Sequence, residues 1–256
     1  MGAIRLIYRL PMLLLLLLLL PPTVLAQTSV FRSSEPGKRS IREITLNAWS
    51  ALACATFGLT REVHGAFVPG AQLIVANHIS WLDIMLLHSV SPMGFVAKAE
   101  IEKWPIAGWI AVFGDTVFHR RGSHDSSSGV ASVMAERLQQ DCKVAIFAEG
   151  GILPGDGVKR FHARMFAAAL DTNSPVQPVM IRYRQDGRHY ADMTFLAGEN
   201  FVGNFFRLLM QRGCTAQLCV LPLIYPAGLQ RRDLASAAEN AVRNAFERET
   251  FETGNG

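Results

Sequence analysis

The stretch Ile74–Leu87, IVANHISWLDIMLL, places a histidine and an aspartate five positions apart, where an apolar, β-branched segment gives way to a helical pattern. Side chains five positions apart do not share a face of a continuous helix, whereas those three or four apart do. His78 and Asp83 can therefore meet only if the helix begins between them. Ser80 and Asp83 have the spacing of a capping box, so we expect the helix to begin at Ser80.

This arrangement allows two interpretations. In the first, His78 folds back over the first helical turn and Asp83 accepts a hydrogen bond from one imidazole nitrogen. That bond would fix the tautomer and leave the other nitrogen free as a base. In the second, Asp83 only caps the helix and His78 is a loop residue. The spacing alone leaves both interpretations open.

The composition limits the class of protein. The 256 residues suffice for one large domain or two small ones, and half of them are apolar. Only 18% are charged, below the quarter or so that is typical of soluble proteins, which indicates a protein that sits against a membrane. The net charge of +4 is too small to argue for nucleic acid, but it suits anionic lipid or phosphorylated substrates. The four cysteines have no metal or redox spacing, and we interpret them as reduced core residues.

The N-terminal segment is a leucine-rich run with basic residues on both sides. A basic start, an apolar run and small residues before Gln27 match a secretory signal peptide. The run Leu10–Leu20 is short for a membrane span, and we expect Pro21-Pro22 to interrupt a helix. Basic residues on both flanks also suit an anchor that enters one leaflet and keeps both ends on the cytoplasmic side. The segment itself leaves both possibilities open.

Beyond a polar linker, apolar strand-like segments alternate with helical ones, which predicts a single α/β domain with a mixed, largely parallel sheet flanked by helices. Pro178 inside a predicted strand favours an edge strand or a bulge. We expect helices at 41–59, 80–88, a short segment ending near 113, 126–140, 161–170 and 231–251. We expect strands at 72–76, 94–97, 116–119, 143–148, 176–183 and 217–221, and either a helix or a lipid-facing patch at 201–210.

The predicted organisation has three parts: a hydrophobic, signal-peptide-like anchor at 1–26, a linker with an amphipathic helix at 27–62, and the main domain at 63–256. The sequence contains no nucleophile elbow, no dinucleotide or P-loop fingerprint and no H-E-x-x-H motif. The seven histidines are scattered. We therefore expect no metal site and no bound cofactor.

Polar residues follow three of the predicted strands. His78 follows the first, Arg120 the third and Glu149 the fourth. Ligands of open α/β sheets bind at the carboxyl ends of the strands, so a base, a guanidinium and a carboxylate are expected to converge there. Taken singly, Arg120 could be a solvated surface charge and Glu149 a turn residue beside glycines.

Four blocks of the sequence resemble the glycerolipid acyltransferases related to bacterial 1-acylglycerol-3-phosphate acyltransferase. Asn77–Asp83 is similar to the family's first block, a histidine and an aspartate with four residues between them. Gly114–Arg120 resembles the second, Phe147–Gly151 the third (Phe-Pro-Glu-Gly-Thr), and Val176–Ile181 the fourth, a proline flanked by valines. The segments at 95–105 and 155–162 look most like the branch that includes lyso-ornithine lipid acyltransferases.

The resemblance implies a mechanism. His78 would take the proton from the free hydroxyl of a lysolipid, and Asp83 would hold His78 in the right tautomer. The hydroxyl would then attack the thioester of acyl-CoA or of an acyl carrier protein, which are substrates rather than cofactors.

The resemblance also implies a substrate-binding set, in which Arg120 binds the anionic head group and Glu149 and its neighbours shape the acceptor site. Its predicted members are Lys98, Phe118, Arg120, Glu149, Gly150 and Pro178. Two residues depart from the family pattern. Ala148 stands where proline is usual and Gly151 where threonine is usual, so the shape of the acceptor site and the identity of the acceptor are the points in doubt.

The resulting hypothesis is a membrane-attached O-acyltransferase that makes a diacyl lipid, with lysophosphatidic acid as the preferred acceptor and lyso-ornithine lipid next. Acyl thioesters are cytosolic, so the resemblance favours a retained anchor and the cytoplasmic face of a bacterial inner membrane. One alternative is an exported, non-catalytic lipid-binding protein of the same fold, which would use the signal peptide. Another is a hydrolase that passes the acyl group to water.

Overall fold

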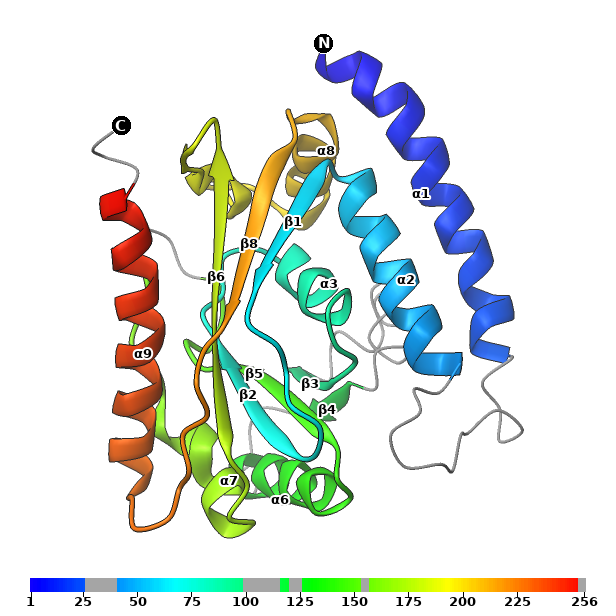
Figure 1. Cartoon of the computed structure of the whole chain (residues 1–256). Coiled ribbons are helices and arrows are strands. Elements are labelled where there is room, and N and C mark those ends of the chain that lie inside the picture. Colours follow the sequence, from blue (N-terminus) through cyan, green and yellow to red (C-terminus); the bar gives the residue numbers. More distant parts are fainter. Residues whose placement is uncertain (26–40, 99–115, 120–125, 153–156, 253–256) are drawn as a thin grey trace. The chain divides into compact units, whose positions relative to one another are not determined.

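The structure is a computed structural model of the chain, and it describes residues 1–25, 41–98, 116–119, 126–152 and 157–252 (Figure 1). The chain forms two compact units. The first comprises residues 1–62, 79–92 and 182–217, and the second comprises residues 63–78, 93–181 and 218–256.

A parallel sheet forms the centre of the second unit. Strand β2 (Gln72–Ala76) is parallel to β5 (Lys143–Phe147) on one side and to β6 (Val176–Gln185) on the other. Strand β3 (Gly94–Lys98) pairs in parallel with β5 and with β4 (Val117–His119). Every residue of β2 is buried, which explains why the strand is a continuous apolar run without alternation.

Three further strands complete the sheet. The strand order is β1-β8-β6-β2-β5-β3-β4, where β1 is Leu59–His64 and β8 is Cys214–Val220. The short β7 (Arg188–His189) pairs antiparallel with β6. The predicted α/β fold with a mixed, largely parallel sheet is therefore confirmed.

Helices of the second unit pack on one another and on its strands. They are α6 (Ser126–Gln139), α7 (Ala167–Asp171), the 3-10 turn Ala163–Phe166 and α9 (Arg231–Glu252). Along α9, an apolar residue is buried at every fourth position from Leu234 to Phe246, as the amphipathic pattern predicted.

The described α-helices of the first unit are α1 (Gly2–Leu25), α2 (Ile41–Thr56), α3 (Leu82–His88) and α8 (Phe201–Met210), beside a 3-10 turn at Ala191–Met193. Helix α1 lies alongside α2 (Figure 1), and the indole N–H of Trp49 donates to the Leu16 carbonyl at 3.0 Å. The Arg9 side chain is 7% exposed. Its guanidinium donates to the carbonyls of Leu209 (3.0 Å) and Gln211 (2.9 Å) at the C-terminal end of α8, where a positive charge is favoured.

Two findings bear on the expected anchor. Helix α1 continues through Pro21-Pro22 to Leu25, so the predicted interruption is wrong. Each proline removes only one backbone donor, and both lie close to the helix end, where few hydrogen bonds remain to be lost. Among the residues that the structure describes, no helix is both long enough and apolar enough to cross a membrane.

Other boundaries differ from the predicted ones. The strand β1 was not predicted, and β8 begins three residues before the expected position. In place of one helix at 161–170 there is a 3-10 turn followed by α7. The helix expected to end near residue 113 lies outside the described residues.

The expectation that Pro178 marks an edge strand is wrong, because β6 lies between β2 and β8. The alternative expectation of a bulge stays a prediction. The Pro178 carbonyl accepts from the N–H of Leu221 at 3.0 Å, one residue beyond the end of β8. Pro178 therefore lies where the pairing of β6 with β8 ends, and the strand tolerates the missing backbone N–H there.

All four cysteines are thiols rather than disulfides, and three of them, Cys54, Cys214 and Cys219, are buried. Burial raises the pKa of the Cys54 and Cys214 thiols to about 12. The interpretation of the cysteines as reduced core residues is confirmed for these three.

Candidate active site

Asn77 ends the β2 pairing and begins the turn that carries His78. Its side chain is buried, with the amide oxygen accepting from the Ile181 N–H and the amide nitrogen donating to the Ile181 carbonyl, both at 2.8 Å. The side chain thus takes the place of a backbone partner for β6. The backbone of β2 is consequently free to leave the sheet at His78.

His78 is half-buried beside the end of β5. Its ring stacks on Phe147, with 3.7 Å between ring centroids and 9° between the planes. Phe147 is the last residue of β5 and pairs with Ala76 of β2. The imidazole therefore lies at the carboxyl ends of two parallel strands, where the sequence analysis expected a ligand site.

Glu149 connects two loops of the second unit. Its carboxylate is 4% exposed, and it accepts from the backbone N–H of His78 (3.3 Å) and from the backbone N–H of Lys159 (2.9 Å). Charge-assisted bonds to backbone donors are strong and hold the main chain in place. Glu149 thereby fixes the backbone of His78 relative to the loop that follows β5.

Gly150 is required by the geometry of the same loop. Its φ of +83° is in the left-handed region, and a Cβ added there would lie 3.2 Å from Cδ2 of His162. The His162 N–H donates to the Ala148 carbonyl at 2.9 Å. A side chain at position 150 would therefore strain the backbone and press on the His162 ring.

In the first unit, Asp83 is fully buried at the start of α3. Its Oδ2 accepts from the N–H groups of Ile79 (2.7 Å) and Ser80 (2.9 Å), and its Oδ1 accepts from the Tyr183 hydroxyl at 2.6 Å. The carboxylate is thus anchored by three donors. Burying a carboxylate without such donors would be unfavourable.

The predicted helix start at Ser80 needs correction, because α3 begins at Leu82 with Trp81 in the N-cap position. One contact of the expected capping box is present: the Asp83 carboxylate accepts from the Ser80 N–H at 2.9 Å. The Ser80 hydroxyl accepts from the Leu82 N–H at 3.4 Å instead of the Asp83 N–H, which donates to the Ser80 carbonyl at 3.0 Å.

The other predicted site residues are placed less completely. Lys98 is the last residue of β3 and pairs with His119 of β4, and Phe118 of β4 pairs with Ala97 of β3. For Lys98 and Phe118 only the backbone is described. Arg120 lies outside the described residues. Pro178 is buried opposite Val75 in the sheet, so its structural role is packing, and its part in substrate binding stays a prediction.

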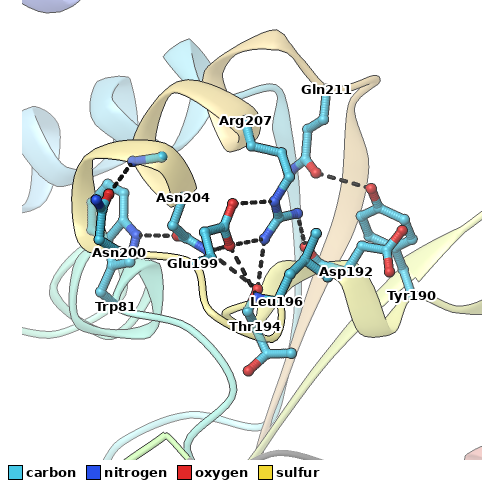
Figure 2. Close-up of polar contacts among 11 residues, drawn as sticks. Trp81, Tyr190, Asp192, Thr194, Leu196, Glu199, Asn200, Asn204, Arg207 and Gln211 are labelled. Carbon is cyan, nitrogen blue, oxygen red and sulfur yellow. Dashed lines mark hydrogen bonds and ion pairs between the residues drawn. The ribbon is translucent and has the colours of Figure 1, made fainter.

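Sequence reasoning missed two contacts of the turn between His78 and Asp83. One is the Tyr183 hydroxyl on Asp83. The other is the Trp81 indole N–H, which donates to Oδ1 of the buried Asn204 at 2.9 Å (Figure 2). Tyrosine and tryptophan in apolar stretches signal that a polar partner is needed, but the sequence does not say which one. Among the described residues, no cluster of histidine, cysteine, aspartate and glutamate is arranged to hold a metal ion.

Comparison with known proteins identifies the family of the chain. The sequence model of the acyltransferase family matches residues 60–182. The lyso-ornithine lipid O-acyltransferase of Pseudomonas aeruginosa is 37% identical over 80% of this chain and 80% of its own length, and that of Rhodobacter capsulatus is 32% identical over 76% and 73%. A 1-acyl-sn-glycerol-3-phosphate acyltransferase of Neisseria gonorrhoeae is 35% identical over 52% of each chain.

A solved structure has the same fold. The crystal structure of the 1-acyl-sn-glycerophosphate acyltransferase PlsC from Thermotoga maritima covers 96% of this chain and 95% of its own, with a TM-score of 0.71 and 22% sequence identity. The family model matches the segment that contains all four sequence blocks, and the relatives are similar over most of their length. The chain therefore belongs to the acyltransferase family, together with the lysolipid acyltransferases.

Proposed function

We propose that the protein is a lysolipid O-acyltransferase in which His78 is the general base and Asp83 its supporting carboxylate. The observation that carries this proposal is the turn from Asn77 to Asp83. It bears an imidazole at the carboxyl ends of β2 and β5 and, five residues later, a fully buried carboxylate with three hydrogen-bond donors. A positioned imidazole supported by a carboxylate is the arrangement that general-base catalysis requires.

The proposed reaction needs no acyl-enzyme. His78 takes the proton of the lysolipid hydroxyl while its oxygen forms a bond to the thioester carbonyl carbon. The carbon–sulfur bond then breaks, and the proton passes from His78 to the leaving thiolate. The donor is acyl-CoA or an acyl carrier protein.

The acceptor is the finer part of the proposal. The lyso-ornithine lipid O-acyltransferases of Pseudomonas aeruginosa and Rhodobacter capsulatus match this chain over about three quarters or more of both lengths, whereas the Neisseria gonorrhoeae enzyme matches over about half. We therefore place lyso-ornithine lipid first and lysophosphatidic acid second, which reverses the order of the sequence-based hypothesis and agrees with the segments at 95–105 and 155–162. Arg120 and Lys98 are the proposed partners of the acceptor's anionic group.

The proposed role of Glu149 follows from its two backbone contacts. With one oxygen on the His78 N–H and the other on the Lys159 N–H, it shapes the acceptor site by holding both loops. Gly150, whose φ is positive, lets the chain turn directly after it. Phe118 and Pro178 remain proposed members of the wall of that site.

The membrane surface is the proposed location. In the first unit, helices α1, α2 and α8 expose several large apolar side chains, more than is usual for a surface in contact with water. The exposed fractions are 73% for Ile7, 57% for Leu15, 72% for Leu18, 55% for Ile44, 53% for Leu52 and 60% for Val202. Helices of this kind lie in the lipid interface without crossing it. We propose that the protein binds the cytoplasmic face of a bacterial inner membrane, where its thioester donor is found.

Retention of the N-terminal segment is part of this proposal. The buried Arg9 guanidinium binds α8, and the Trp49 indole binds the Leu16 carbonyl. Cleavage before Gln27 would remove both contacts and expose the surfaces that they join. Sequencing the N-terminus of the mature protein tests this point, and a start at Gln27 would favour the exported lipid-binding protein instead.

The reaction is tested by thiol release from a long-chain acyl-CoA, with each lysolipid in turn. We compare the wild type, His78→Ala and the control His64→Ala, which changes an exposed histidine. Release that needs a lysolipid, is abolished in His78→Ala and is kept in His64→Ala supports the proposal and identifies the acceptor. Release without a lysolipid would indicate a hydrolase. No release with acyl-CoA or acyl carrier protein would indicate a binding protein.

A further inference from the structure

Tyr183 contributes a hydroxyl to the carboxylate of Asp83 from a distant part of the chain. It lies in the part of β6 that belongs to the first unit, as α3 does. Both side chains are fully buried, and the hydroxyl lies 2.6 Å from Oδ1 of Asp83, a short distance typical of an O–H donor to a charged acceptor.

The two oxygens of Asp83 have different kinds of donor. Oδ2 accepts from the N–H groups of Ile79 and Ser80, which belong to the turn itself. Oδ1 accepts from Tyr183, which is one hundred positions away in the sequence. The turn therefore fixes one edge of the carboxylate, while the sheet fixes the other edge and with it the rotation of the carboxylate plane.

The surroundings of Tyr183 keep its hydroxyl protonated, so that it acts as a hydrogen-bond donor. Burial, and then the negative charge of Asp83, raise the pKa of the Tyr183 hydroxyl well above its usual value. Cys54 of α2 and Cys214 of β8 are titratable groups that also act on Tyr183. Burial raises the pKa of both thiols to about 12, so these three groups stay protonated across the range of an enzyme assay.

We propose that Tyr183 is a positioning residue for catalysis: its hydroxyl orients the Asp83 carboxylate through Oδ1, and so determines how strongly Asp83 supports His78. The inference rests on the proposed function, in which Asp83 acts on His78. It adds a residue outside the four sequence blocks to the machinery of the reaction, because the blocks end at Ile181.

A structural alternative must be separated from this role, since a buried hydrogen bond also stabilises the fold. Tyr183→Phe keeps the ring and removes only the hydroxyl. The matched control is Tyr190→Phe, which removes a hydroxyl that donates to Gln211 in the same unit at 2.9 Å. If the role is only structural, Tyr183→Phe changes the melting temperature and the amount of folded enzyme, but not the shape of the pH–rate profile.

We expect Tyr183→Phe to lower kcat about tenfold with KM nearly unchanged, since a hydrogen bond to a charged group is lost at a residue that does not contact substrate. The acid limb of the pH–rate profile should move to higher pH, because a carboxylate that has lost one donor acts more strongly on His78. Replacing Tyr183 by 3-fluorotyrosine, a stronger donor of the same shape, should move the limb the opposite way. Tyr190→Phe should leave kcat and the profile unchanged.

The same assays include His78→Ala and Asp83→Asn, so that the two claims can fail separately. If these two variants keep wild-type activity, the proposed catalytic pair is wrong. If they are inactive while Tyr183→Phe and the fluorotyrosine enzyme keep the wild-type kcat and pH profile, the pair stands and the role of Tyr183 is refuted. A loss of activity in Tyr183→Phe that follows the loss of folded protein, with an unshifted profile, refutes it as well.

Discussion

Arg207 and Glu199 form a two-point ion pair, with Arg207 Nε 2.8 Å from Glu199 Oε1 and Nη2 2.9 Å from Oε2 (Figure 2). The same guanidinium donates to the carbonyls of Thr194 (2.7 Å) and Asp192 (2.5 Å). Glu199 also accepts from Nδ2 of Asn204 at 2.9 Å, and Asn204 accepts from Trp81. The segment before α8, the helix itself and the turn that carries Trp81 are thereby joined by one polar network.

The ion pair predicts an acid-dependent stability. Hydrogen bonds from Arg207 lower the pKa of Glu199 from 4.5 to about 2, so between these values the folded state binds fewer protons than the unfolded state. The stabilisation should be present above about pH 4.5 and be lost as the pH falls towards 2. Melting temperatures between pH 6 and pH 3 should fall less steeply for Glu199→Gln than for the wild type.

Asp186→Asn is the control for this experiment. Asp186 pairs with Arg212 at 2.6 Å, but both side chains are more than 60% exposed, and exposed pairs contribute little. The melting temperature of Asp186→Asn should fall with decreasing pH as steeply as that of the wild type. Parallel curves for the wild type and Glu199→Gln would contradict the prediction.

Asn204→Ala should destabilise the protein by about 2 kcal/mol, since it removes a fully buried amide that accepts from the Trp81 indole N–H and donates to Glu199. Asn200→Ala removes the side-chain cap of α8, where the Asn200 oxygen accepts from the Gly203 N–H, and should cost about 1 kcal/mol. Urea unfolding of both variants measures the difference. Equal losses would mean that the bond to Trp81 contributes no more than an ordinary helix cap.

Gly150→Ala should lower the free energy of unfolding by more than Gly187→Ala. Both glycines have a positive φ, +83° and +76°, but a Cβ at Gly150 meets the His162 ring, while a Cβ at Gly187 meets nothing within 4 Å. The backbone strain alone costs about 1 kcal/mol, and Gly150→Ala adds the contact. Urea unfolding of the pair isolates that contact, and an equal effect in both variants would show that the His162 ring moves aside without cost.

The exposed apolar face of α1 predicts membrane binding. A double variant, Ile7→Glu with Leu18→Glu, should bind vesicles of anionic phospholipid at least tenfold less tightly, because two apolar side chains no longer enter the interface. The melting temperature should change little, because both residues are more than 70% exposed. Co-sedimentation with vesicles provides the measurement.

The control for membrane binding is Val133→Glu on α6, in the other unit, where the residue is 37% exposed. It should bind vesicles as the wild type does. Wild-type binding by the double variant would argue against α1 as the membrane contact.

Long apolar runs made much of the fold predictable. Strands β2 and β5 are buried along nearly their whole length, so their sequences differ clearly from their surroundings. Strand β1 is mostly exposed and its sequence, LTREVH, contains three charged or titratable residues, so no apolar run marked it. Its place in the sheet depends on pairing with a segment about 150 residues later, which local patterns do not encode.

The candidate site was predictable in its residue types but not in its contacts. The positions of His78 and Asp83 around a helix start followed from spacing. The partners of these residues did not, because Tyr183 and Asn204 are brought to the turn by β6 and α8 from 100 and 123 positions away. Likewise, the bond from Glu149 to the backbone of His78 depends on the parallel register of β2 and β5.

The burial of the cysteines makes thiol labelling a probe of folding. Thiolates, not thiols, react with disulfide and maleimide reagents, and the raised pKa values of Cys54 and Cys214 keep both almost entirely protonated at neutral pH. Cys219 is buried too, whereas Cys142 is partly exposed. The native protein should therefore be labelled first at Cys142. Each opening of the core should expose a further thiol, and mass spectrometry should detect the added label.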